Sequence, residues 1–247
     1  MRVEQALLGL LARATGGASP AASCAYALYL LRGVDPRTGH LFLCTDGVAV
    51  GHGGKPASDG HDAIYGPGQH NYPVEYMERR FPVRIDLYGI NLDSGGPGRF
   101  RGGCGVVREV TLLAGEAVLA TKMDNVVRPP FGVAGGLAGR GGSVVINPGR
   151  VDEKRLDSVS DGTVMKAGDT LRFATPGGGG WGHPFDRAID NVESDVRNGF
   201  VSVLSALEDY GVVVDSSTLC VNADATDVRR RSSRRSSALF HRGEYFD

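Results

Sequence analysis

The strongest constraint on the fold is a Gly-rich run, DSGGPGRFRGGCGVVR, at residues 93–108. Six of its sixteen residues are glycine, and two arginines, Arg99 and Arg101, flank Phe100. Glycine lets two backbones approach closely or adopt positive φ, but it weakens helices and central strands. A flexible linker is the alternative interpretation, although a pure Gly/Ser linker would lack the phenylalanine and the regularly placed arginines. The run therefore predicts a tight extended crossing against which other segments pack.

Two further glycine clusters lie at residues 126–142 and, as TPGGGGWG, at residues 175–182. The 37 glycines among 247 residues are about twice the ordinary share of about 7%. Glycine does not recur at every third position, which excludes collagen. We expect most of these glycines to be architectural, in polyproline-II-like segments where only glycine fits. Backbone N–H groups of Gly-rich loops can also bind phosphate, and that alternative stays open.

Charge and hydropathy exclude several classes of partner. The net charge of −1 gives no general attraction to nucleic acid or to an anionic membrane surface. No apolar run approaches the roughly 18 residues of a membrane span. The four cysteines share no C-x-x-C spacing, and the N-terminus does not resemble a signal peptide. We therefore expect a cytoplasmic protein with no nucleic-acid or membrane partner.

Hydrophobic periodicity and turn residues predict a β-rich α+β fold. It should contain short-stranded sheets, a Gly-rich bundle of polyproline-II-like extended segments and a few short helices. The predicted helices cover residues 3–14, 72–80, 190–198 and 202–210. The predicted strands cover residues 24–31 and 40–44 as a hairpin, then 83–91, 106–113, 116–122, 144–147, 212–215 and two short strands within 161–173. Residues 1–225 should form the folded region, and residues 226–247 a disordered basic Ser/Arg tail.

Several long motifs occur in a fixed order along the chain. They are NYPVE with RFP at residues 71–82, the Gly-rich run at 93–108, TPGGGGWGHP at 175–184, DVRNG with YGV at 195–212, and LFHRG at 239–243. In these motifs the chain resembles the C-terminal part of the hydantoinase B/5-oxoprolinase B family. That family includes the B subunit of ATP-dependent N-methylhydantoinases and the corresponding subunits of acetone and acetophenone carboxylases. The resemblance covers nearly the whole chain, but the N-terminal half of a family protein is missing.

The resemblance implies a contribution to ATP-dependent hydrolysis of a cyclic amide, of the hydantoin or 5-oxoproline type. The chain would act in complex with a hydantoinase A-like ATP-binding subunit and with the N-terminal half of the B subunit. ATP and Mg²⁺ would lie on the partner subunit, and a divalent metal in the missing N-terminal half, so we expect no cofactor or metal on this chain. The alternatives are a subunit of an ATP-dependent ketone carboxylase and a non-catalytic structural remnant.

No catalytic residue is assigned from the sequence. The candidates for contact with substrate or phosphate are Ser94, Gly95, Gly96, Arg99, Arg101, Gly178 and Gly179. The arginines could bind a phosphate or carboxylate in a bidentate manner, and ion pairs that hold loops together are at least as good an interpretation. Neither glycine cluster has the spacing of a P-loop or the strand–helix context of a dinucleotide-binding turn.

The histidines give a weaker signal. His52, His61 and His70 lie on loops near Asp59 and Asp62. A metal site built from them is one interpretation, and solvated loop histidines are the favoured one, because the spacing matches no known metal motif. The cysteines have no base nearby in sequence, so a nucleophilic role is not favoured.

Overall fold

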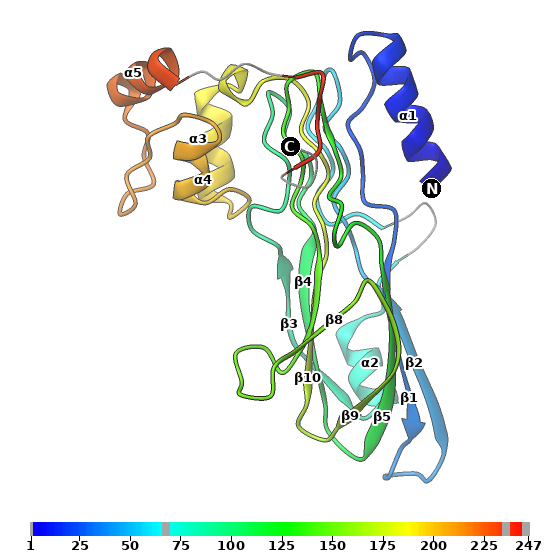
Figure 1. The fold of residues 1–247 in the computed structure, drawn as a ribbon. Coiled ribbons are helices and arrows are strands. Elements are labelled where there is room, and N and C mark those ends of the chain that lie inside the picture. The colour runs from blue at the N-terminus through cyan, green and yellow to red at the C-terminus, as the bar shows by residue number, and fades with distance from the viewer. Residues whose placement is uncertain (1, 66–69, 234–237, 244–247) are drawn as a thin grey trace.

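The computed structural model describes residues 2–65, 70–233 and 238–243. The helices are α1 (Arg2–Ala14), α2 (Val74–Arg80), η1 (Pro184–Asp186), α3 (Ile189–Arg197), α4 (Val203–Glu208) and α5 (Ala223–Ser233). Two antiparallel sheets form one end of the molecule together with helix α2, and extended Gly-rich segments run from the sheets toward α1, α3, α4 and α5 at the other end (Figure 1). Among the described residues, no helix combines the length and the hydropathy needed to cross a membrane.

The first sheet has the order β2-β1-β5-β9 and is antiparallel throughout. Its strands are β1 (Ala27–Val34), β2 (Leu41–Gly47), β5 (Glu116–Met123) and β9 (Val159–Lys166). The predicted hairpin is confirmed, with Val34 opposite Leu41. Its turn is closed by Gly39 at φ +71°, a conformation that glycine adopts without steric cost.

The second sheet has the order β3-β4-β10-β7-β8. Its strands are β3 (Val83–Ile90), β4 (Val106–Leu112), β7 (Ser143–Ile146), β8 (Lys154–Leu156) and β10 (Thr170–Ala174). The two sheets share one apolar core, in which the rings of Tyr29 and Phe173 lie 5.9 Å apart. The alternation of apolar and polar residues predicted β3 and β4, because successive side chains of a strand point to opposite faces.

The Gly-rich stretches meet in a single bundle. Segment 175–182 runs through it and is contacted by segments 51–54, 94–105 and 131–139. A Cβ on Gly177 would lie 2.1 Å from the carbonyl oxygen of Ser94, and a Cβ on Gly180 would lie 2.1 Å from that of Pro97. Gly178 and Gly179, which lie between these two glycines, face segments 51–54 and 131–139 instead. A contact direction that returns after three residues is the period of a polyproline II helix, so the predicted bundle is confirmed.

Hydrogen bonds complete the packing of the bundle. Four successive amide nitrogens of the central segment donate to carbonyl oxygens of four other places in the chain at 2.8–2.9 Å. The pairs are Gly178 N to Gly103 O, Gly179 N to Ala22 O, Gly180 N to Leu137 O and Trp181 N to Phe100 O. Buried backbone groups need such partners, and here other extended segments supply them in place of a helix or sheet ladder.

The C-terminal helices enclose a second, smaller core around Val192, Ala206 and Tyr210. Ser202 caps α4 as predicted, with its side chain accepting a hydrogen bond from Ser205 N. The predicted strand at 212–215 is reduced to one isolated bridge, between Val214 and Val221.

The prediction of a disordered tail from residue 226 is wrong for the part of it that the structure describes. Helix α5 includes residues 226–233, and β11 (Phe240–His241) pairs with β6 (Gly132–Val133). The helix is held because Arg230 donates to the carbonyl oxygens of Tyr210 and Arg187. Residues 234–237 and 244–247 lie outside the described part of the chain.

Candidate functional site

Arg101, one of the predicted contact residues, is buried among carboxylates. Its Nη1 and Nη2 donate to the two oxygens of Asp62 at 2.6 and 3.1 Å, and its Nε lies 3.4 Å from Asp195 Oδ1. The guanidinium also covers the ring of Phe200 at 4.8 Å. Burial alone would lower the pKa of Arg101, but the hydrogen bonds and charges of the two aspartates raise it above its ordinary value. Arg101 therefore holds a loop and a helix together, in line with the ion-pair alternative.

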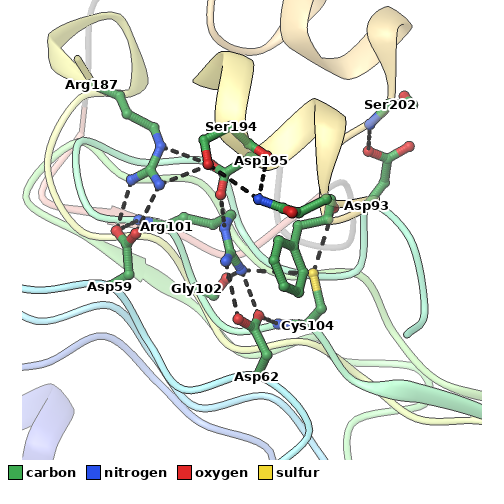
Figure 2. A network of polar contacts seen from close by, with 12 residues as sticks. Asp59, Asp62, Asp93, Arg101, Gly102, Cys104, Arg187, Ser194, Asp195 and Ser202 are labelled. Carbon is green, nitrogen blue, oxygen red and sulfur yellow. Dashed lines mark hydrogen bonds and ion pairs between the residues drawn. The ribbon is translucent and has the colours of Figure 1, made fainter. Parts of the chain in front are cut away.

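Arg187, which sequence analysis did not single out, forms the other half of this network (Figure 2). Only 2% of its side chain is exposed, and it donates to both oxygens of Asp59 at 2.7 Å. Its Nε donates to Asp195 Oδ2 at 3.0 Å, so Asp195 bridges the two arginines. Three carboxylates and two guanidiniums thus tie the loop at 59–62, the Gly-rich run and α3 to one another.

The glycine and serine candidates are fully engaged in the fold. The hydroxyl of Ser94 donates to Asn91 O at 2.6 Å and accepts from Gly105 N at 2.9 Å. Gly96 N donates to Gly178 O at 2.7 Å, and the N–H groups of Gly178 and Gly179 donate to carbonyls as described above. These amides point at backbone oxygens, which favours the architectural interpretation over a phosphate cradle.

The two remaining candidates differ in exposure. Gly95 is buried, and a Cβ there would lie 2.2 Å from Gly102 O, so close packing explains the glycine. Arg99 is exposed, with its guanidinium 5.5 Å from the centre of the Phe100 ring. Of the predicted contact residues, Arg99 alone presents a charged side chain to solvent.

The loop histidines do not assemble a metal site in the part of the chain that is described. The rings of His52 and His61 lie edge to face at 6.3 Å, but Asp59 and Asp62 are bound to the two arginines. No group of three or more potential ligands gathers anywhere among the described residues. Burial, with a smaller contribution from His61, lowers the pKa of His52.

A second buried charge pair lies between the two sheets and was not predicted. Asp46 on β2 pairs with Arg108 on β4, and both are almost fully buried. The guanidinium also covers the ring of Tyr88 at 5.0 Å. Burial raises the pKa of Asp46 to about 6, against the opposing charge of Arg108. The pair fastens one sheet to the other across an otherwise apolar core.

A cavity of about 440 Å³ lies beside the Gly-rich bundle. Of the residues that the structure describes, four ionisable ones line it: Asp93, Arg140, Asp209 and His241. Sequence reasoning missed this group because its members come from four segments that lie far apart in the sequence. Volumes of this size are typical of small-molecule sites, and convergent ionisable groups mark the default candidate in a protein of unknown activity. We call the cavity that these four side chains line the Arg140 cavity.

The paired sheets, the glycine bundle and the motifs that build it define a class of protein, the hydantoinase B/oxoprolinase type. The family model described as Hydantoinase B/oxoprolinase matches residues 1–184, more than half of the chain. The chain therefore belongs to the Hydantoinase B/oxoprolinase family.

Two relatives illustrate the range of names in this family. The chain is 33% identical over 201 residues to the beta subunit of the caprolactamase of Pseudomonas jessenii, a match that covers 75% of this chain and 34% of the relative. It is 32% identical over 173 residues to a protein of Pseudomonas sp. (strain NS671) with a provisional name as the B subunit of a D-/L-hydantoinase, covering 70% of this chain and 29% of the relative. The chain thus spans about a third of the length of these relatives.

Solved structures share the fold. A crystal structure of the ATP-dependent caprolactamase from Pseudomonas jessenii superposes with a TM-score of 0.73 at 28% identity, over 87% of this chain and 39% of that chain. A nucleotide-free acetone carboxylase structure gives the same TM-score of 0.73 at 19% identity, over 87% of this chain and 33% of that one. The second likeness shows a common fold alone.

Proposed function

We propose that this chain is the C-terminal part of a hydantoinase B-like subunit and contributes to ATP-dependent hydrolysis of a cyclic amide, of the hydantoin or 5-oxoproline type. The observation that carries the proposal is the 33% identity to the beta subunit of a caprolactamase over 75% of the chain. Caprolactam, hydantoin and 5-oxoproline all contain an amide bond within a ring, so one reaction type covers the three substrates. A cytoplasmic location stays a prediction.

The proposed assembly contains a hydantoinase A-like ATP-binding subunit and the remaining part of the B subunit. ATP and Mg²⁺ would be bound by the first, and a divalent metal by the second. An amide carbonyl is a poor electrophile, and activation at the expense of ATP lowers the barrier to attack by water. The buried arginine–aspartate network would then serve by keeping the bundle rigid, since its charges are already paired within the chain.

Exposed apolar surface supports a partner. Helix α1 presents Val3, Leu7 and Leu10, which are 54–73% exposed and follow one another on one face at helical spacing. The outer face of the first sheet presents Leu41 and Leu43, with Leu41 85% exposed. Apolar stripes of this kind mark contact surfaces in soluble proteins. The chain spans about a third of the length of its relatives. The remaining part of such a B-type protein is therefore the proposed partner that covers these apolar surfaces.

The test is reconstitution from three components: this chain, the remaining part of the B-type protein and an A-type subunit. ATP hydrolysis and ring-opened product would be measured with hydantoin, 5-oxoproline and caprolactam, with omission of this chain as the control. The expected result is ring opening that depends on both ATP and this chain. Carboxylation of acetone in the presence of bicarbonate, without ring opening, would replace the proposal with the ketone carboxylase alternative. Full activity in the absence of this chain would support the alternative that the chain is a non-catalytic structural remnant.

A further inference from the structure

The Arg140 cavity combines positive and negative groups in one small space. We propose that it binds a small zwitterionic amino acid, a molecule that carries an ammonium group and at least one carboxylate. The inference rests on the proposed function for lactam substrates such as 5-oxoproline, because hydrolysis of a lactam releases this class of product, whereas hydantoin would give an N-carbamoyl amino acid without an ammonium group. The C–N bond breaks, the carbonyl carbon takes the oxygen of water, and the nitrogen leaves with the protons as an ammonium group. The carboxylate and the ammonium then belong to one open chain.

Two residues supply donors for the carboxylate. Arg140 is positioned by its backbone, whose N–H donates to Ser94 O at 2.8 Å, while 64% of its side chain is exposed. His241 on β11 accepts a hydrogen bond from Ala138 N at its Nδ1, at 2.9 Å. A neutral imidazole that accepts at Nδ1 carries its proton at Nε2, which is therefore a donor. A guanidinium and an imidazole N–H are suitable partners for a carboxylate.

Among the residues that the structure describes, none accepts a hydrogen bond from the guanidinium of Arg140. Its Nη2 lies 3.8 Å from Asp93 Oδ2, which is an ion pair but too long for a hydrogen bond. Asp93 itself is fixed, since its Oδ1 accepts from Ser202 N at 2.7 Å at the start of α4 (Figure 2). A guanidinium has five N–H donors, so this single long contact leaves capacity for a bidentate carboxylate.

Two carboxylates supply the negative side. Asp209, just beyond α4, accepts from the hydroxyl of Ser205 at its Oδ2, at 2.7 Å, and Asp93 also lines the cavity. Burial raises the pKa of Asp209, and the charge of Arg140 opposes that shift. An ammonium ion between these carboxylates would compensate the burial of negative charge. Two carboxylates would repel a free phosphate, which argues for a ligand with an amine.

Apolar side chains also line the cavity. Pro97, Val126, Val127, Pro129 and Leu137 line it. These side chains suit the methylene groups that separate the amine from the carboxylate in an opened lactam. A mostly apolar lining with a few polar groups is the usual pattern of a small-molecule site.

The test is calorimetric titration of the full chain with 6-aminohexanoate and L-glutamate. Hexanoate and hexylamine, which carry one charge each, are the control ligands. We expect saturable binding of at least one amino acid, at least tenfold tighter than either control ligand. Equal affinity for hexanoate would overturn the amino-acid proposal in favour of a simple carboxylate site, and no binding of any probe would overturn it altogether.

Variants then locate the binding. Arg140→Gln and Asp209→Asn should each weaken amino-acid binding at least tenfold, whereas Arg155→Gln, which changes another exposed arginine on β8, should leave it unchanged. Val127→Trp should also block binding by filling the cavity, and Val127 is 56% exposed, so this change spares the core. Unchanged affinity in all three cavity variants, with unchanged melting temperature, would place the binding elsewhere and contradict the proposal.

The reconstituted complex separates this inference from the proposed function. One outcome is that the complex opens the ring while its Arg140→Gln variant keeps wild-type kcat, KM and product inhibition. That result would overturn amino-acid binding in the Arg140 cavity and support the proposed function. If the chain binds the amino acid but the complex turns over no cyclic amide, the proposed hydrolysis would be overturned. The Arg140 cavity would then still be an amino-acid site.

Discussion

Gly178 lies so close to His52 that a Cβ on Gly178 would stand 2.1 Å from the carbonyl oxygen of His52. Two backbones cannot be this near unless one residue has no side chain. The contact lies in the bundle, where the amides of Gly178, Gly179 and Gly180 donate hydrogen bonds to other segments.

Gly178→Ala should therefore destabilise the fold by about 3 kcal/mol or more, because the new methyl group meets backbone that cannot move aside without breaking hydrogen bonds. The measurement is the free energy of unfolding from urea titration. Gly89→Ala is the matched control, since a Cβ at Gly89 in β3 meets nothing within 4 Å. Equal stability of the two variants would contradict the close packing of the bundle.

Asp195→Asn should cost about 3–5 kcal/mol of unfolding free energy, because it removes the negative charge shared by two buried arginines. Asp161→Asn is the control: its ion pair with Arg32 lies at the surface, where such pairs contribute only about 0–1 kcal/mol. Thermal or urea unfolding of the two variants would be compared. A loss at Asp195 no greater than at Asp161 would show that the network is not a stabilising element.

Asp46 should make stability depend on pH. Its pKa is raised to about 6 in the folded state, against about 3.9 in an unfolded chain. The folded state thus binds the proton more tightly, so this group favours folding below about pH 4 and loses that contribution as the pH rises to about 6. The difference in unfolding free energy between wild type and Asp46→Asn should fall by up to about 3 kcal/mol over this range. A flat or rising difference would contradict the shift.

Leu7→Glu together with Leu10→Glu should prevent assembly with the remaining part of the B-type protein while leaving the melting temperature of the isolated chain unchanged. Both side chains are more than half exposed on α1, so the substitutions disturb little of the chain's own packing. Co-purification and size-exclusion chromatography give the readout. Val151→Glu, at a fully exposed position in a loop, is the control for added charge. Assembly that tolerates the double variant would exclude this helix face as the contact surface.

The sequence predicted the local elements and the role of the glycines, because both depend on patterns within a short stretch. Alternation located β3 and β4, and the absence of side chains at Gly177 and Gly180 implied close backbone contact. The partners of the charged residues could not be read in this way: Asp59 and Arg187 are 128 positions apart, and no local pattern links them.

The same reason explains the errors near the C-terminus. Composition alone predicts disorder for the Arg/Ser-rich stretch, since little of it is apolar. Helix α5 is ordered instead by tertiary contacts, with Thr226 fully buried and its hydroxyl accepting from Val213 N. Two-residue strands such as β6 and β11 are likewise set by their partner and not by their own sequence.

The glycine bundle also constrains how the chain reaches its native state. Its central segment draws its hydrogen-bond acceptors from Ala22, Gly103 and Leu137, so loops of very different length must close before it has any partner. Contacts of such long range slow folding. We expect the bundle to form last, and during synthesis it cannot begin to assemble until residue 182 has left the ribosome.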